Sequence, residues 1–327
     1  MKKVLLIIIV LLSMAGFVFV FFRFFSDDIF STVSDGGDSL QSTYETTVDG
    51  LIEEGCRGGM SRLKQSDFEP VFCTTAVFRE PRYVERFRKY KGPTADFVPV
   101  VMYHFFYDET KEEPTHGRNS HSIQSVRSHL QWLRENGYVT LSMDELYEWL
   151  QGNIEVPAKC VVLTSDDGQD NFFELLQPEL EKYGFTATSF AVTSWRKNIP
   201  YKLTLPNIEL HSHTHNMHRG EIPQGGIPDN RGIMQGVTVE TGVKDLKKSS
   251  KILGGSKYLA YPYGTYGGNA KEIVRKAGFR LAFTTDSGYV RRGDDPYQLY
   301  RMRVNGSITD IGFSYLINYP EVALKYE

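Results

Sequence analysis

Cysteine is scarce in this chain of 327 residues, which has only Cys56, Cys73 and Cys160. No two of them form a C-x-x-C pair, so the sequence does not support a zinc ribbon or a thioredoxin-type site. Cys160 enters an apolar, strand-like run and is expected to be a buried thiol. Cys56 and Cys73 lie in one segment. Whether they pair in an oxidising compartment is left open by the sequence.

An excess of charge of either sign is also missing. The chain has 37 Lys and Arg residues against 40 Asp and Glu residues, for a net charge of −3. Nucleic-acid-binding domains usually carry a basic face, so this balance argues against such a partner. No internal repeat is visible. The 41% of hydrophobic residues are enough to build a core, and the length suits an α/β domain with or without a second unit.

A long apolar run is present only at the N-terminus. Residues 4–22, VLLIIIVLLSMAGFVFVFF, carry no charge, and a helix of this length spans roughly 28 Å, about the hydrocarbon thickness of a bilayer. Lys2 and Lys3 favour a cytoplasmic N-terminus, although Arg23 weakens that bias. Because no A-x-A cleavage pattern follows, we expect residues 1–25 to be an uncleaved signal anchor in the cell membrane. A cleaved signal peptide is the alternative.

The next segment differs in composition from both its neighbours. Residues 26–50 are polar, acidic and rich in Gly, Ser and Thr, as in a stalk that lifts a domain off a membrane. Residues 51–95 are mixed and predict no particular fold. We therefore expect residues 26–95 to be an extracytoplasmic stalk and pre-domain segment, followed by one folded domain over residues 96–327.

From Phe97 onward, strand and helix patterns alternate. Short apolar runs such as FVPVVMYH and KCVVLTS are typical of buried strands, and SMDE, Ser142 to Glu145, is a capping box that begins a helix. Repeated strand-then-helix order predicts a mainly parallel sheet, either open or closed into a barrel. In both architectures functional sites lie at the carboxyl ends of strands.

Polar residues of distinctive types follow several predicted strands. Half of the eight histidines stand in HSHTHNMH, His211 to His218, and Asp166 and Asp167 follow another strand. One Asp and two His give a divalent ion three protein ligands and leave a position for water, as in catalytic metal sites. The alternatives are that Asp-Gly only forms a turn and that individual histidines are hydrogen-bonded loop residues, which we favour for His211 and His215.

Three motifs in order carry a resemblance to a known family. TSDDG (Thr164–Gly168), HTHNMH (His213–His218) and YPYG (Tyr261–Gly264) are similar to the T-F-D-D-G, H-[ST]-x-x-x-H and P-Y-G motifs of polysaccharide deacetylases, the NodB-homology enzymes of carbohydrate esterase family 4. The histidine spacing, with VVMYH before the first motif, most resembles the subgroup that deacetylates poly-β-1,6-N-acetylglucosamine. The resemblance covers roughly residues 97–317 and implies a distorted (β/α) barrel of the NodB-homology type.

The resemblance also implies a set of roles for the residues at the strand ends. A divalent metal, with Zn²⁺ favoured and Co²⁺, Ni²⁺ or Fe²⁺ also suitable, is held by three residues: Asp167, His213 and His218. The remaining groups are implied to act on water and substrate: Asp166 as the base, His104 as the acid that protonates the leaving amine, and the backbone N–H of Tyr263 as a donor to the oxyanion.

The chain departs from the family pattern at several positions. Ser165 replaces the usual Phe of the first motif, and Phe105 follows His104 where some relatives carry Asp. The arginine that normally orients the base is absent from the third motif. Arg301 or Arg303 is a candidate replacement, with an exposed strand residue as the alternative. TTDSGYV lacks the tryptophan of the fourth motif, which leaves one wall of the acetate pocket unidentified.

These observations predict an enzyme that acts on sugar polymers. We expect a metal-dependent hydrolase that removes N-acetyl groups from an extracytoplasmic polysaccharide, with Tyr263 and Tyr266 as candidate groove residues. The polymer is β-1,6-linked N-acetylglucosamine, peptidoglycan or a chitin-like oligomer, with the first favoured. The expected partners are this polysaccharide and, through the N-terminal helix, the cytoplasmic membrane. The alternatives are a non-catalytic binding module on a decayed deacetylase fold and an O-acetyl esterase.

Overall fold

The computed structural model describes residues 85–195, 205, 207–219 and 232–319, all within the second of two compact units, Cys56–Glu327. The expected signal anchor, most of the expected stalk, and the possible Cys56–Cys73 pair lie outside the described residues. Among the described helices, none combines the length and apolar character needed to cross a membrane.

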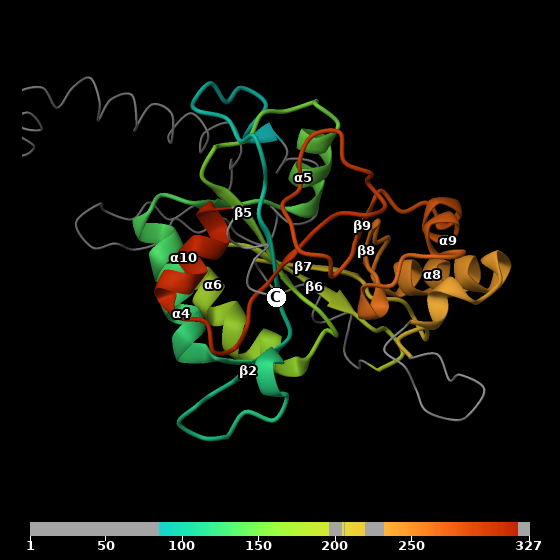
Figure 1. The fold of residues 1–327 in the computed structure, drawn as a ribbon, viewed down its shortest axis with the longest axis horizontal. Helices are drawn as coiled ribbons and strands as arrows, with labels where there is room; N and C mark the ends of the chain where they lie inside the picture. The colour runs from blue at the N-terminus through green and yellow to red at the C-terminus, as the bar shows by residue number, and fades with distance from the viewer. Residues whose placement is uncertain (1–84, 196–204, 206, 220–231, 320–327) are drawn as a thin grey trace, which may run out of the picture. The chain divides into compact units, whose positions relative to one another are not determined.

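A curled parallel sheet forms the centre of the domain (Figure 1). All of its strand pairings are parallel, as the alternation of strand and helix patterns predicts. The strand order is β10-β1-β5-β6-β7-β8-β9, with β4 added beside β5. The strands are β1 (Val100–Tyr103), β4 (Val139–Thr140), β5 (Cys160–Ser165), β6 (Ala187–Ala191), β7 (Ile208–Ser212), β8 (Tyr258–Ala260), β9 (Leu281–Phe283) and β10 (Met302–Arg303).

The two edges of the sheet are joined by one short segment. Leu299 accepts a hydrogen bond from the backbone of Thr284 and donates one to Ala282, so it pairs with β9. Three residues later, Met302 pairs with Val101 of β1. The chain therefore passes from one sheet edge to the other within residues 299–303.

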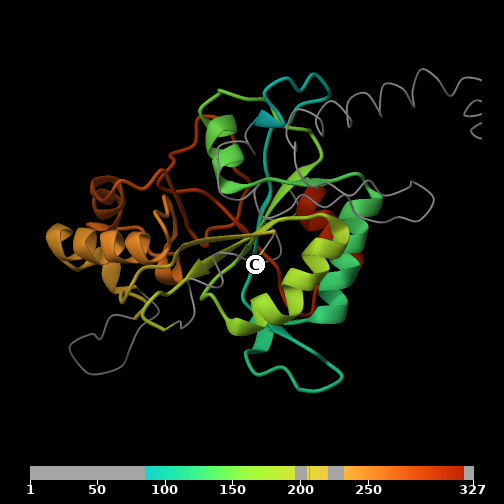
Figure 2. The same ribbon diagram turned by 180° about the vertical axis from the view of Figure 1, so that it is seen from behind.

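Helices cover the sheet on both sides (Figures 1 and 2). Two groups are visible, with α4, α6 and α10 on one side and α8 and α9 on the other. The helices are α4 (Ile123–Glu135), α5 (Met143–Leu150), α6 (Gln177–Tyr183), α8 (Val239–Ile252), α9 (Ala270–Ala277) and α10 (Asp310–Asn318). A separate two-stranded pair, β2 (Phe105–Tyr107) with β3 (Ser120–Ser122), extends the chain beyond β1.

Local sequence signals explain where these helices begin and end. Ser142 and Glu145 form the expected reciprocal capping box at the start of α5. Gly184, with φ of +66°, ends α6 in the left-handed conformation that glycine favours. The helical segment before Gly184 is not uniform, because residues 172–176 form a π-helical turn first. Pro178 has no N–H to donate to the preceding turn, which fits a change of helix type at this point.

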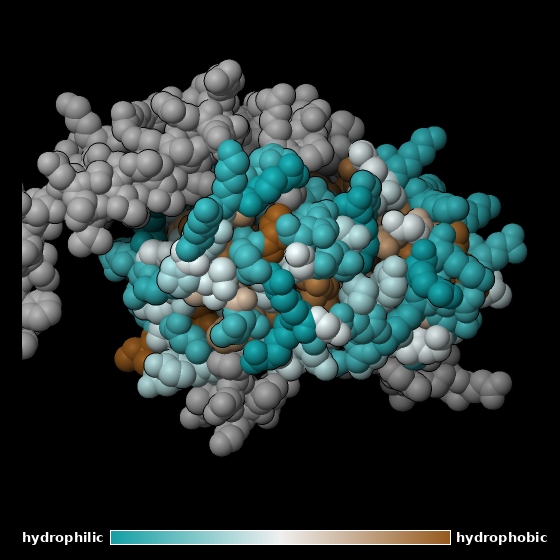
Figure 3. All heavy atoms as spheres, turned by 90° about the horizontal axis from the view of Figure 1, so that it is seen from above, coloured by the Kyte–Doolittle hydropathy of each residue, from teal (hydrophilic) through white to brown (hydrophobic). Residues whose placement is uncertain are grey.

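Both faces of the sheet are buried. Successive residues of β5 alternate between two hydrophobic clusters, with Val161 and Leu163 in one and Cys160 and Val162 in the other. Strands buried on two faces read as continuous apolar runs, which is the pattern seen in the sequence. Cys160 is a buried free thiol, as expected. From above, hydrophilic side chains cover most of the described surface, with only small separate hydrophobic patches (Figure 3).

Candidate active site

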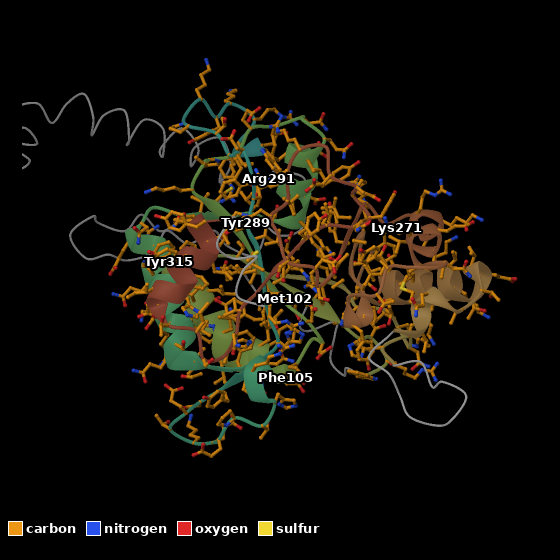
Figure 4. The ribbon with its side chains drawn as sticks, in the orientation of Figure 1. Met102, Phe105, Lys271, Tyr289, Arg291 and Tyr315 are labelled. Atoms are coloured by element: carbon orange, nitrogen blue, oxygen red, sulfur yellow. The ribbon has the colours of Figure 1, made fainter. Side chains whose placement is uncertain are left out.

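The register of the sheet brings His104 and Asp166 together at the carboxyl ends of two neighbouring strands. Tyr103 of β1 pairs with Ser165 of β5, so the next residues along each strand, His104 and Asp166, emerge side by side. The backbone N–H of Asp166 also donates to the carbonyl of Tyr103 at 3.1 Å. In Figure 4, Met102 lies near the centre of the ribbon, and Phe105, the neighbour of His104, lies below it where β1 leads into β2.

Asp167, His213 and His218 converge in space. Nε2 of His213 lies 3.6 Å and Nε2 of His218 lies 3.2 Å from the same carboxylate oxygen of Asp167, Oδ1. One ligand-type atom from each residue lies within 4.8 Å of the others. Two imidazole nitrogens aimed at one carboxylate oxygen are the arrangement expected around a small cation.

The chemistry of these three side chains fits a divalent metal. Nδ1 of His213 lies 2.8 Å from the carbonyl of Ala260, which only accepts, so Nδ1 carries the hydrogen and Nε2 presents its lone pair toward Asp167. Burial lowers the pKa of His213 to about 4, which keeps the ring neutral at pH 7 as a metal ligand requires. Two nitrogens and one oxygen suit Zn²⁺ and neighbouring transition metals.

Asp166 is held by a buried arginine. Nη1 and Nη2 of Arg301 donate to Oδ1 and Oδ2 of Asp166, each at 2.7 Å. Both side chains are almost completely buried. Burial alone would raise the pKa of Asp166, but the charge and hydrogen bonds of Arg301 lower it well below its ordinary value. Asp166 is therefore ionised and fixed in orientation.

Arg301 itself is fixed by the surrounding strands. Its Nε donates to the carbonyl of Thr284 at 2.9 Å, and its Nη1 lies 3.3 Å from Oγ1 of Thr164. The guanidinium lies 5.8 Å from the ring centroid of Phe190. Of the two sequence candidates, Arg301 contacts Asp166, whereas Arg303 donates to Asn119 at 2.9 Å. The alternative of an exposed strand residue is wrong for Arg301.

His104 is held through its backbone. The hydroxyl of Ser165, the residue that replaces the family's Phe, donates to the carbonyl of His104 at 3.1 Å. Burial lowers the pKa of the His104 ring, and the charges of Asp166 and Asp167 oppose that shift. The serine thus makes a contact to the His104 peptide that a phenylalanine is unable to make.

Backbone strain is concentrated around this site. Four non-glycine residues of the described chain have positive φ, and three belong to the site motifs: Asp167, Thr214 and Tyr263, with φ of +71°, +73° and +58°. Such conformations cost about 1–3 kcal/mol each and persist where function requires a particular direction of the chain. The next residue after Asp167 is necessarily glycine, because a Cβ on Gly168 would lie 2.6 Å from that of Ala191.

The two remaining histidines of the cluster contact other groups. Nδ1 of His215 lies 2.9 Å from Oγ1 of Thr193, in the turn after β6. Nδ1 of His211 lies 3.2 Å from Oγ of Ser256. His211 belongs to strand β7, so the histidine cluster begins in a strand and not in a loop as the sequence suggested. Neither belongs to the group of Asp167, His213 and His218.

Aromatic rings border His218. Tyr263 and Trp195 each lie 4.8 Å from it between ring centroids, and both are exposed, at 41% and 47%. Tyr266, the other groove candidate, packs instead against the hydrophobic cluster of α8 and α9. Trp195 was not identified from the sequence. Its position four residues beyond the end of β6 is the signal that would have drawn attention to it.

Comparison with known proteins finds similarity to one family over part of the chain. Residues 153–282 match the family model for polysaccharide deacetylases. That range contains Asp166, Asp167, His213, His218 and Tyr263. His104, the candidate acid, and Arg301, the partner of Asp166, lie outside it.

Two curated proteins and one solved structure illustrate the relationship. YxkH of Bacillus subtilis is 26% identical over 228 residues, which are 66% of this chain and 74% of that protein. The poly-β-1,6-N-acetyl-D-glucosamine N-deacetylase of Staphylococcus aureus is 26% identical over 242 residues, 68% of this chain and 78% of the relative. The Streptococcus pyogenes deacetylase PplD, solved with acetate, superposes with a TM-score of 0.58 at 22% identity, over 69% of this chain and 100% of its own.

Proposed function

We propose that this chain, in which residues 153–282 match the polysaccharide deacetylase family model, is a metal-dependent hydrolase that removes N-acetyl groups from an extracytoplasmic polymer of N-acetylglucosamine. The observation that carries the proposal is the position of two carboxylates with different partners. Asp166 is bound by Arg301, while the adjacent Asp167 faces two imidazoles. One carboxylate is thereby available for proton transfer and the other for a cation.

A divalent ion bound by Asp167, His213 and His218 would act as a Lewis acid and promote ionisation of water near neutral pH. Asp166 accepts a proton from the attacking water, because its orientation is fixed and it is ionised. The backbone N–H of Tyr263 donates to the oxygen on which negative charge develops. His104 donates a proton to the departing nitrogen, so that amide and water become acetate and a free sugar amine.

Poly-β-1,6-N-acetylglucosamine is the favoured polymer. The Staphylococcus aureus relative is named for that substrate and aligns over 78% of its length. Because the shared identity is 26%, peptidoglycan and chitin-like oligomers belong in the same assay as competing substrates.

The N-terminal segment is the basis for placing the catalytic domain outside the cytoplasm in this proposal. Residues 1–25 act as a transmembrane signal anchor, residues 26–95 as the stalk and pre-domain segment, and residues 96–327 as the catalytic domain outside the cytoplasm. The uncharged run of residues 4–22 supports this arrangement. A protease added to intact cells is expected to remove the domain and leave a membrane-bound N-terminal fragment.

The experiment that tests the function is acetate release by the purified full-length chain. The substrate is a β-1,6-linked N-acetylglucosamine pentamer, with and without chelator, and with Zn²⁺, Co²⁺ or Ni²⁺ added back. Asp166→Asn is expected to lower the rate by about 10²–10⁴-fold while metal content is retained, whereas Asp167→Asn is expected to lose the metal.

Two other results would change the assignment. Faster acetate release from O-acetylated than from N-acetylated oligomers would make the chain an esterase. Pentamer binding without acetate release under any metal, and the same result with peptidoglycan fragments, would make it a non-catalytic binding module.

A further inference from the structure

Two exposed aromatic rings lie next to the metal-ligand candidate His218. Large exposed apolar side chains are few in the described chain, and they fall into two groups. Ile311, Tyr315 and Tyr319 lie on α10 or at its end, while Trp195 and Tyr263 both contact His218 with ring centroids 4.8 Å away. Trp195 follows β6 and Tyr263 follows β8, so the two rings belong to distant parts of the sequence.

The turn that carries Trp195 is hydrogen-bonded to the loop that follows β7. The backbone N–H groups of Thr193 and Ser194 donate to the carbonyls of Thr214 and His215 at 3.1 and 3.0 Å. The Thr193 hydroxyl also meets the His215 ring at 2.9 Å. These bonds continue the pairing of β6 with β7 beyond the sheet, so the Trp195 backbone has a defined position beside the site.

Tyr263 is also held in place. Its φ of +58° turns the chain sharply within the 3-10 turn Pro262–Gly264. Gly232 packs directly against this turn, since a Cβ there would lie 2.7 Å from the carbonyl of Pro262 and 3.5 Å from the Tyr263 ring. Aromatic side chains have few rotatable bonds and lose little conformational freedom when they bind a ligand, which favours their use as contact surfaces.

We propose that Trp195 and Tyr263 form an aromatic subsite that selects a hexosamine ring of gluco configuration at the catalytic centre. This inference rests on the proposed deacetylase function. In a β-linked gluco ring every substituent is equatorial, so both faces present axial C–H groups that stack on the electron-rich face of an aromatic ring. The galacto epimer places an axial hydroxyl on one face, which disturbs that contact.

The first measurement compares matched substrates. The full-length, metal-loaded chain is assayed on β-1,6-linked N-acetylglucosamine and N-acetylgalactosamine pentamers and on 4-methylumbelliferyl acetate, which has no sugar ring. The parent is expected to prefer the gluco pentamer about tenfold in kcat/KM. Trp195→Ala is expected to raise KM for that pentamer about tenfold, with kcat and the rate on the aryl acetate within about twofold of the parent. Trp195→Phe is expected to preserve the preference.

The control removes an equally exposed aromatic ring elsewhere. Tyr315 on α10 is also 47% exposed, and it lies well apart from Phe105, the neighbour of His104, in Figure 4. Tyr315→Ala is expected to leave all three substrates unaffected. If Trp195→Ala slows the pentamer and the aryl acetate equally, the ring supports His218 and does not contact sugar, and the proposal is wrong. The proposal is also wrong if the ratio of kcat/KM for the gluco and galacto pentamers is the same in Trp195→Ala as in the parent.

A binding readout separates failure of this inference from failure of the deacetylase function. Trp149 is fully buried and Trp132 is partly buried in the core, so Trp195 is the exposed tryptophan of the described chain. Titration with the gluco pentamer is expected to change tryptophan emission in the parent but not in Trp195→Phe. A chain that releases no acetate yet shows this difference retains the subsite without the chemistry. The absence of any emission change in the parent overturns the subsite.

Discussion

Arg301 and Asp166 form a two-point ion pair in which each guanidinium nitrogen lies 2.7 Å from its own carboxylate oxygen. A planar guanidinium matches a carboxylate in this way, whereas a lysine ammonium offers only one point of contact. The pair fixes the rotation of the Asp166 carboxylate about its own axis. It also takes the place of the arginine that the resemblance leads one to expect in the third motif.

Replacing Arg301 by methionine is expected to reduce both stability and activity. The change keeps much of the side-chain volume but leaves a buried carboxylate without its cation, at a cost of about 3–5 kcal/mol in the free energy of unfolding. Loss of orientation at Asp166 is expected to lower kcat/KM about 100-fold or more. Chemical denaturation and acetate release measure the two effects.

The stability that the Arg301–Asp166 pair contributes depends on pH in a defined direction. Because Arg301 depresses the pKa of Asp166, the stabilisation is complete above the ordinary aspartate pKa, about 3.9, and is lost as pH falls through the lower folded-state value. Arg303→Met, which removes a contact to Asn119, is the matched control. Equal losses in the two variants would contradict a special role for Arg301.

Replacing His104 by asparagine is expected to separate amide from ester hydrolysis. An amine is a poor leaving group unless it is protonated, whereas a phenolate departs unaided. Acetate release from the pentamer is therefore expected to fall about 10²–10⁴-fold, with a much smaller effect on 4-methylumbelliferyl acetate. A parallel fall on both substrates, measured at saturating metal, would assign His104 to structure and not to proton donation.

Ser165 is expected to act as a positioning residue for His104. Ser165→Ala removes one hydrogen bond to the His104 carbonyl, with an expected cost of about 1 kcal/mol in stability. If the bond positions the acid, kcat for the pentamer falls about tenfold and the aryl acetate rate changes little. Ser165→Thr, which retains the hydroxyl, is the rescue variant. No change in the pentamer-to-ester ratio in Ser165→Ala would rule out this role.

Glu209 is expected to make the domain less stable as pH rises. Its carboxyl accepts from the N–H of Met143 and from Thr188, and burial raises its pKa to about 8. Since the folded state binds a proton that the unfolded state has already released, stability declines between about pH 5 and pH 8. Glu209→Gln keeps both accepted bonds and is expected to flatten that decline in urea titrations, whereas Glu240→Gln on the exposed start of α8 is expected to leave it unchanged.

Much of the fold was predictable because its signals are local. The apolar run ending at Ser165, the capping box at Ser142 and the glycine after α6 all specify short stretches of backbone. The convergence of Asp167, His213 and His218 was also predictable, because the carboxyl ends of parallel strands lie on the same side of the domain.

The features that sequence reasoning left open depend on distant parts of the chain. Arg301 and Arg303 are two residues apart, so the alternation of an extended strand places them on the same face and does not choose between them. The choice depends on which of them lies beside the distant Asp166. The contact of Ser165 with the His104 carbonyl requires the register of β1 on β5. Trp195 becomes informative only when its turn is seen beside His218.

The segment that joins the two edges of the sheet also sets the order in which the site is completed. Arg301 lies 135 residues after Asp166, so a chain that emerges N-terminus first presents the carboxylate long before its cation. Until residues 299–303 insert between β9 and β1, the base has no fixed orientation. A chain that ends before Arg301 would therefore contain Asp166, Asp167 and all of the histidines, but it would lack the guanidinium that orients the base.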